Sequence, residues 1–255
     1  MSRLQKLFNN KQNLLSIYLT AGYPQRNAML ELIPLLAKNG VDFIEAGMPY
    51  SDPLADGKTI QHSSSIALKN GMNLELYFKQ IKQVRYKTDI PILFMGYFNQ
   101  VLKYGIESFL QQCSDSGIEA LIIPDLTPEI YQKYYQKIFK KYDLGLSFLI
   151  TPTTSDERIA LIDSLTTAFI YVVSISGTTG KTDDFSAKQI AYFKRIKKLT
   201  TRNPKMIGFG IDTASKYRIV NTYADGAIIG SAFIKAISDN DYKQKAVDFV
   251  RKIKS

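Results

Sequence analysis

The feature that most constrains the fold of this 255-residue chain is a regular alternation between short, β-branched apolar runs and longer segments of helical periodicity. The eight runs divide the chain into units of about 32 residues, the size of a strand–helix repeat. They lack polar alternation, which is typical of parallel strands covered on both faces. The predicted strands are residues 14–19, 43–46, 90–95, 120–123, 146–150, 170–174, 206–209 and 226–229. The predicted helices are residues 27–39, 74–87, 106–116, 128–142, 155–165, 187–199, 213–222, 231–237 and 242–254.

Eight strand–helix units in one chain predict an α/β fold, a single (β/α)8 TIM barrel. A doubly wound open sheet is the alternative, because eight strands do not by themselves force closure. No Gly/Ser-rich or Pro-rich linker divides the chain, so we expect one domain over residues 1–255. Leu4, Leu7 and Phe8 predict a short N-terminal helix that covers one end of the fold, and residues 242–254 predict a C-terminal helix.

Composition excludes several classes of protein. Hydrophobic residues make up 45% of the chain, yet no run reaches the roughly 18 apolar residues of a membrane span. A single cysteine, Cys113, and a single histidine, His62, exclude an internal disulfide and a multi-histidine metal centre. The net charge of +10 comes from lysines spread over helical segments, which favours solvated helix faces over a nucleic-acid surface and also fits a phosphate-bearing substrate. Without a secretory signature, we expect a cytoplasmic protein, or a plastid stromal one if the gene is plastid-encoded.

The first candidate site follows the second predicted strand. Glu45 lies inside that strand, where an uncharged residue is the norm, and burial of a carboxyl group raises its pKa toward the range of a general acid or base. The loop that follows is long for a strand-to-helix connection, and Asp56 lies 11 residues beyond Glu45. The loop is long enough to fold back over the strand end, so we expect the two carboxyl groups to face one substrate at the carboxyl end of the barrel. The alternative for Glu45 is a structural ion pair with a lysine at the strand end. A metal site that adds Asp52 and His62 is a weaker interpretation, since no known metal-loop spacing is present.

The second candidate site consists of glycine-rich turns after the sixth, seventh and eighth strands. The turns contain Gly180, Gly210 and Gly230, and together they are typical of the phosphate site of barrels. A nucleotide P-loop fails on spacing because Ile175 stands where glycine is required, and Thr213 breaks a dinucleotide fingerprint in the same way.

Further polar and apolar residues follow other strands. Tyr97, Asn99 and Asp125 are candidates for the mouth of the barrel, although Asp125 also suits the cap of the helix near residue 128. Met48, Met95 and Phe209 suit an apolar wall for a ring-shaped substrate, with core packing as the default interpretation.

Several of these segments resemble the tryptophan synthase alpha subunit family. The most specific one is residues 43–57, FIEAGMPYSDPLADG, and it continues with TIQ at residues 59–61. Residues 18–24, YLTAGYP, are also similar. Shorter matches are MGYFN at 95–99, PDL at 124–126, SGTTG at 176–180, GFG at 208–210 and GSA at 230–232. The matching segments lie in order along nearly the whole chain.

The resemblance implies a TIM-barrel lyase that cleaves indole-3-glycerol phosphate to indole and glyceraldehyde 3-phosphate without a metal or cofactor of its own. It implies that Glu45 protonates the indole ring and helps to deprotonate the glycerol hydroxyl, and that Asp56 stabilises the positive ring nitrogen. The implied substrate-binding residues are Tyr171 for positioning, Thr179 on a mobile sixth loop, Gly180, Gly210, Gly230 and Ser231 for the phosphate, and Ile122 and Phe209 beside the indole ring.

The resemblance also implies a partner. A beta subunit, which carries pyridoxal phosphate, takes the indole for tryptophan synthesis within an α2β2 heterotetramer. Three alternatives remain: a stand-alone lyase that releases free indole, a catalytically silent subunit that activates the beta subunit, and another phosphate-binding barrel such as an isomerase. Retention of both carboxyl groups argues against the silent subunit.

Overall fold

The parallel sheet closes into a barrel. The computed structural model of the chain describes residues 1–53, 56–174 and 184–255. Within these residues one sheet has the strand order β5-β4-β3-β2-β1-β9-β8-β7-β6, and a single residue, Phe148, joins its two end strands. The closure confirms the predicted TIM barrel and excludes the open sheet. The strands are β1 (Leu14–Thr20), β2 (Phe43–Gly47), β3 (Ile92–Met95), β4 (Ala120–Ile122), β5 (Gly145–Ser147), β6 (Leu149–Ile150), β7 (Ile170–Val173), β8 (Lys205–Gly208) and β9 (Gly226–Ile229).

The fifth predicted strand is interrupted. Residues 146–150 were expected to form one strand, but β5 pairs with β4 and β6 pairs with β7 on either side of Phe148. The side chain of Phe148 is buried against the ring of Tyr131 at 5.4 Å, and its carbonyl accepts a hydrogen bond from the N–H of Tyr171 at 2.9 Å. The chain therefore changes neighbours at this residue, which is where the barrel closes.

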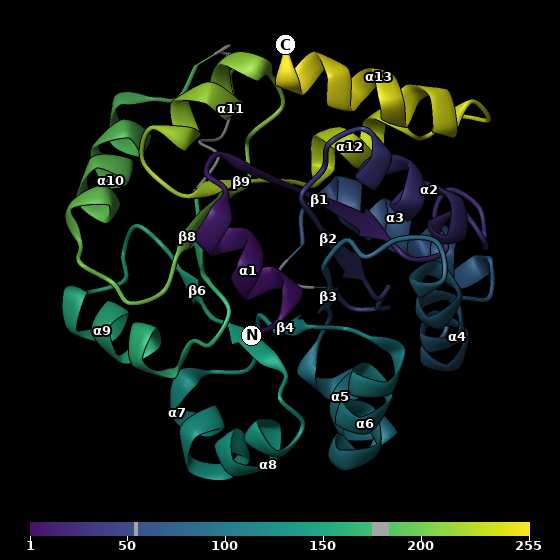
Figure 1. Ribbon diagram of the computed structural model, residues 1–255, viewed down its shortest axis with the longest axis horizontal. Helices are drawn as coiled ribbons and strands as arrows, with labels where there is room; N and C mark the ends of the chain where they lie inside the picture. The colour runs from purple at the N-terminus through teal and green to yellow at the C-terminus, as the bar shows by residue number, and fades with distance from the viewer. Residues whose placement is uncertain (54–55, 175–183) are drawn as a thin grey trace.

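Helices surround the barrel as a ring, and α1 lies across one end of it (Figure 1). This arrangement follows from the predicted repeat of strand and helix. No helix in the described part of the chain is long and apolar enough to span a membrane. The helices are α1 (Arg3–Asn10), α2 (Met29–Lys38), α3 (Lys58–Lys69), α4 (Leu74–Arg85), α5 (Phe98–Tyr104), α6 (Ile106–Ser116), α7 (Pro128–Ile130), the π-helical turn η1 (Tyr131–Tyr135), α8 (Gln136–Lys141), α9 (Asp156–Leu165), α10 (Ala187–Lys198), α11 (Ala214–Asn221), α12 (Ser231–Ala236) and α13 (Tyr242–Lys254).

Two helices, α3 and α5, are absent from the predicted set. The buried face of α3 includes Ser63 and Ser64, so the apolar periodicity that identifies a helix in the sequence is missing there. The Ser63 hydroxyl lies 2.7 Å from the Thr20 hydroxyl, which satisfies this buried polar group. Helix α5 has only seven residues before Gly105 ends it with a φ of 89°. One continuous helix was predicted over residues 128–142, whereas the structure has α7 and α8 with the π-helical turn η1 between them.

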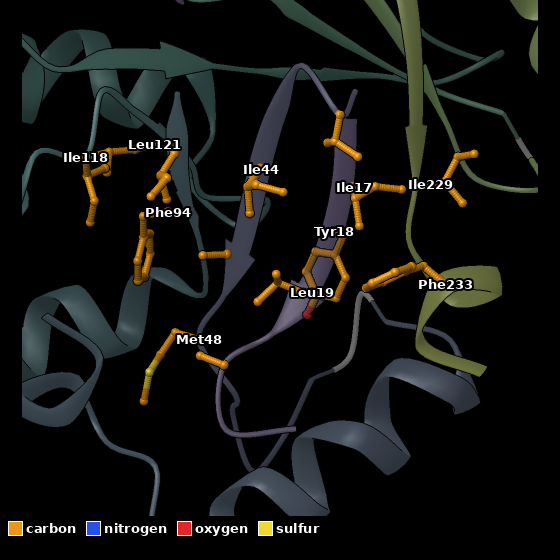
Figure 2. Close-up of a cluster of buried hydrophobic side chains, with 14 of the residues drawn as sticks. Ile17, Tyr18, Leu19, Ile44, Met48, Phe94, Ile118, Leu121, Ile229 and Phe233 are labelled. Atoms are coloured by element: carbon orange, nitrogen blue, oxygen red, sulfur yellow. The ribbon is translucent and has the colours of Figure 1, made fainter. Parts of the chain in front are cut away.

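The core has two layers. Side chains such as Leu14, Phe43 and Met206 fill the barrel interior, whereas alternate residues of the same strands pack outward against the helices. Figure 2 shows part of the outer layer, with Ile17 of β1 beside Ile44 of β2. Strand residues therefore divide between an inner and an outer face, and this division determines which side chains reach the lumen.

Helix α1 closes the amino end of the barrel. Its Phe8 contacts the rings of Phe43 and Phe169, with centroids 6.2 and 6.0 Å apart. Glu119 accepts hydrogen bonds from Nε of Arg3 at 2.6 Å and from the N–H of Leu4 at 2.9 Å. The amino end is thus covered by an apolar plug, and the carboxyl ends of the strands are left to form a site.

Candidate active site

The Glu45 carboxyl group lies in β2 and is fully buried, with 0% of the residue exposed. Neither of its oxygens has a hydrogen-bond partner among the described residues. Burial raises the pKa of Glu45 to about 8, and the nearby Ser16 hydroxyl offsets this only in part, since the two groups are not in hydrogen-bonding geometry. The group is therefore protonated at neutral pH and can act as a general acid.

Asp56 occupies the loop after β2 and is half-buried. Its Oδ2 accepts a hydrogen bond from the Tyr97 hydroxyl at 3.0 Å, and its backbone carbonyl accepts one from Nε2 of Gln61 in α3 at 2.9 Å. Burial raises the pKa of Asp56, whereas the bond from Tyr97 lowers it. One contact therefore holds the side chain of Asp56 and the other holds its backbone, and together they fix the position of the carboxyl group.

Two tyrosine hydroxyl groups are affected by the charges of both carboxyl groups. Burial raises the pKa of Tyr171 and that of Tyr18, and the charges of Glu45 and Asp56 raise both further. Tyr18 of β1 is the register partner of Glu45 in β2. Both carboxyl groups therefore lie close enough to Tyr18 and Tyr171 for their charges to affect the same two hydroxyl groups.

Glycines make room for the two tyrosine rings. A Cβ atom on Gly47 would lie 2.3 Å from Oη of Tyr18, and one on Gly208 would lie 2.4 Å from Oη of Tyr171. Any larger residue at either position would displace the hydroxyl group. The glycine at each strand end therefore fixes where the phenol reaches the lumen.

A cavity of about 500 Å³ opens beside these groups. Asp56 and Tyr171 line it together with four residues from the turns after β8 and β9, namely Phe209, Gly210, Gly230 and Ser231. The cavity thus brings together six of the ten residues predicted for the site. Glu45 lies within the barrel near the Tyr18 and Tyr171 side of the cavity.

The remaining predicted residues lie elsewhere or outside the described residues. Ile122 faces the barrel interior with Tyr171 in the inner core and is not among the residues that line the cavity. Thr179 and Gly180 lie outside the described residues.

The turn after β8 has an unusual backbone. Phe209 and Gly210 have consecutive positive φ angles of 71° and 73°. The Ser174 hydroxyl lies 3.0 Å from the carbonyl oxygen of Gly208 and 2.6 Å from that of Phe209. This contact fixes a conformation that costs free energy for a non-glycine residue such as Phe209. The held turn presents main-chain groups to the cavity, which suits an anion.

Asp125 and Asn99 have other roles than those expected. Oδ1 of Asp125 accepts a hydrogen bond from the N–H of Phe98 at 2.8 Å, and Thr127 caps α7 instead. Nδ2 of Asn99 donates to the Tyr50 hydroxyl at 3.0 Å, in a separate groove of about 680 Å³ that neither carboxyl group lines. Of the two roles suggested for Asp125, the cap of the helix near residue 128 is therefore not the observed one.

A metal site finds no support among the described residues, where no three His, Cys, Asp or Glu side chains are grouped to hold an ion. His62 is exposed on α3. Two residues that line the cavity, Tyr18 and Lys235, are not among the predicted site residues. Tyr18 lies in β1 opposite Glu45 of β2, and this pairing becomes visible only once the register of the two strands is known.

The fold and the site define a (β/α)8-barrel enzyme with a buried carboxyl group in β2 and a cavity lined by the turns after β8 and β9. The family model described as tryptophan synthase alpha chain matches residues 4–254. The chain belongs to this family. It is a tryptophan synthase alpha chain, a lyase that cleaves indole-3-glycerol phosphate.

Relatives and solved structures are similar to this chain over 95–100% of its length. The tryptophan synthase alpha chain of Christiangramia forsetii is 49% identical and covers 100% of this chain and 99% of its own. That of Flavobacterium johnsoniae is 48% identical, with 100% of both chains covered. The crystal structure of tryptophan synthase subunit alpha from Legionella pneumophila is similar with a TM-score of 0.89, 30% identity, and 100% and 97% coverage. A chain of the tryptophan synthase complex from Pyrococcus furiosus has a TM-score of 0.86, 32% identity, and 95% and 98% coverage.

Proposed function

We propose that Glu45 and Asp56 are the catalytic pair that cleaves indole-3-glycerol phosphate in this chain. The observation that carries the proposal is the buried Glu45 carboxyl group, which has no hydrogen-bond partner among the described residues. Glu45 is the register partner of Tyr18, which lines the cavity together with Asp56. Burial of an unpartnered polar group costs free energy, so its retention indicates a task in the reaction. The pKa of Glu45, about 8, suits a proton donor at neutral pH.

In the first step Glu45 donates its proton to C3 of the indole ring. C3 becomes tetrahedral, and the ring nitrogen takes the positive charge of an iminium group. Ionised Asp56 accepts a hydrogen bond from that N–H and stabilises the charge, which is worth most in a site with little water. The two carboxyl groups thus need opposite protonation states, and the pKa of Glu45 is raised more strongly than that of Asp56.

In the second step the Glu45 carboxylate removes the proton from the hydroxyl group on the carbon attached to C3. The oxygen forms the aldehyde carbonyl, and the bond between that carbon and C3 breaks. The bond electrons restore the C2–C3 double bond, and the nitrogen regains its lone pair. Indole and glyceraldehyde 3-phosphate leave, and Glu45 holds a proton again, so the cycle needs no cofactor.

The cavity suits the two ends of this substrate. We assign the phosphate to main-chain N–H groups of Gly210, Gly230 and Ser231, with Gly180 as a further donor. Both Phe209 and Tyr171 line the cavity and suit an aromatic ring, with their own centroids 6.1 Å apart. Ile122 and Thr179 complete the proposed substrate-binding residues.

We propose that the indole passes to a beta subunit, which carries pyridoxal phosphate, within an α2β2 heterotetramer. Support comes from the similarity to a chain of the tryptophan synthase complex of Pyrococcus furiosus. A stand-alone lyase that releases free indole is the second candidate, because the proposed catalytic groups all lie within this chain.

The test of the catalytic pair is an assay for indole released from indole-3-glycerol phosphate. We expect Glu45→Gln and Asp56→Asn each to lower kcat by at least about 100-fold, the size of a general acid–base contribution. Each variant keeps the shape of the side chain, so binding of inorganic phosphate and the thermal unfolding profile check that the site is intact. Wild-type turnover in both variants would contradict the proposal.

The partner is tested by adding a purified beta subunit from a relative. We expect co-elution in size-exclusion chromatography and a higher rate of indole consumption. If the chain stays alone and its rate is unchanged, the stand-alone lyase is favoured.

A further inference from the structure

Lys235 of α12 lines the same cavity as Gly230 and Ser231, which have been assigned to the phosphate. It is the one cationic side chain among the described residues that line this cavity. We propose that Lys235 is a substrate-binding residue whose ammonium group attracts and holds the phosphate dianion. The identity of the substrate rests on the function proposed above, whereas the chemistry requires only a phosphate group.

The helix places Lys235 on the correct face. Ser231 is the first residue of α12, and Lys235 follows it by four positions, so their Cβ atoms lie about 5–6 Å apart on one side of the helix. A lysine side chain is long and flexible enough to bring its ammonium group back over the adjacent turn. The charge therefore reaches the region where Ser231 and Gly230 meet the cavity.

Lys235 is also free to bind. It makes no hydrogen bond or ion pair with any residue that the structure describes. A lysine that served only to stabilise the fold would be expected to pair with a neighbouring carboxylate. An exposed, unpaired cation beside a cavity instead raises the local concentration of anions.

The other charged group at this end of the cavity is neutralised. Asp212 lines the cavity, but its Oδ1 lies 2.9 Å from Nζ of Lys216, which is largely buried. That pair cancels the repulsion that Asp212 would exert on a phosphate. The residual side-chain charge among the described residues at the turns after β8 and β9 is therefore that of Lys235.

The test uses steady-state kinetics with indole-3-glycerol phosphate on the full chain. We expect Lys235→Gln to raise KM about five- to tenfold while kcat changes by less than about twofold, because a charge on a remote phosphate contributes to binding in both the ground state and the transition state. Lys235→Arg keeps the charge and should restore KM to within about twofold. The matched control is Lys198→Gln on α10, which removes the same charge from an exposed position outside the cavity and should leave KM unchanged.

Salt and free phosphate provide a second readout. Added NaCl should weaken substrate binding to the wild type, and less so to Lys235→Gln. Inorganic phosphate, titrated by calorimetry without turnover, should bind Lys235→Gln more weakly by a similar factor. If the wild type releases no indole, the proposed function fails, but this titration still tests Lys235. Equal phosphate affinity in the wild type and Lys235→Gln, or an equal KM rise in Lys198→Gln, would overturn the inference.

Discussion

The hydroxyl group of Tyr97 donates a hydrogen bond to Oδ2 of Asp56 across 3.0 Å. Tyr97 follows β3 and precedes α5, whereas Asp56 follows β2, so the bond connects two neighbouring loops at the carboxyl end of the barrel. It acts on the pKa of Asp56 in the direction opposite to burial. The proposed mechanism needs Asp56 ionised, and Tyr97 therefore widens the pH range over which the site is active.

Replacing Tyr97 by phenylalanine should move the acidic limb of the kcat/KM profile to higher pH. Loss of one hydrogen bond of about 1 kcal/mol corresponds to a shift of roughly 0.5–1 pH unit, because one unit of pKa is about 1.4 kcal/mol. The measurement is kcat/KM for indole release over a range of about two pH units on either side of neutrality. Tyr104→Phe, at the last residue of α5 and not among the residues that line the cavity, is the control and should keep the wild-type profile. An acidic limb that does not move in Tyr97→Phe would show that the bond does not tune Asp56.

The stability of the protein should fall as the pH rises from about 4.5 to about 8, because of Glu45. The pKa of Glu45 is raised from 4.5 to about 8 by burial, so between these values the unfolded chain releases a proton that the folded chain keeps. The folded state then binds more protons, and the free energy of unfolding decreases with pH until Glu45 ionises in the folded state as well. Glu45→Gln removes this dependence. The variant should match the wild type near pH 4.5 and exceed it by a few kcal/mol above pH 8.

Urea unfolding of both proteins at a series of pH values measures this difference. Asp52→Asn, which alters an exposed carboxyl group in the same loop, is the control and should leave the pH dependence unchanged. A constant difference between Glu45→Gln and the wild type across the series would mean that Glu45 is already ionised in the folded protein.

The sequence predicted the barrel and much of the site because both depend on strand ends. Apolar runs locate the strands, and a carboxyl group such as Glu45 within one run stands out against its surroundings. The glycine turns at Gly210 and Gly230 follow strands that are adjacent in the barrel, so their convergence on one cavity follows from the topology. Identity with the family's motifs supplied the reaction, which no physical pattern in the chain specifies.

Other features depend on register and on contacts between distant residues. The place of Tyr18 beside Glu45 requires the pairing of β1 with β2, which one sequence does not reveal. The break at Phe148 arises where the barrel closes, and the side chain of Phe148 is as apolar as those of an unbroken strand. The sequence left the role of Asp125 open because a carboxylate near two helix starts can cap either one, and only the fold decides between them.

Gly208→Ala should reduce both stability and turnover. The new Cβ atom would lie 2.4 Å from Oη of Tyr171, so the ring must leave its position or the strand must move, at a cost of about 1–3 kcal/mol. Since Tyr171 lines the cavity, we expect a rise in KM or a fall in kcat of about tenfold or more. Ile207→Val is the control. Ile207 is on the same strand but packs in the outer core, so it should lose about 0.5–1.5 kcal/mol without loss of turnover. Wild-type kinetics in Gly208→Ala would contradict the role of Tyr171 in positioning the substrate.

Glu119→Ala should destabilise the protein without changing kcat. Glu119 holds α1 over the amino end of the barrel by accepting hydrogen bonds from Nε of Arg3 and the N–H of Leu4. Its carboxyl group is mostly buried, so its removal leaves two donors unsatisfied and costs about 1–3 kcal/mol. The proposed catalytic groups lie at the opposite end of the barrel, and α1 does not contribute to the cavity that Asp56 and Tyr171 line. Urea unfolding and the indole assay, run on the same preparations, measure the two effects separately. Glu119→Gln keeps an acceptor oxygen for the N–H of Leu4 and should lose about half as much stability. A matching fall in kcat for Glu119→Ala would mean that closure of the amino end is coupled to the geometry of the active site.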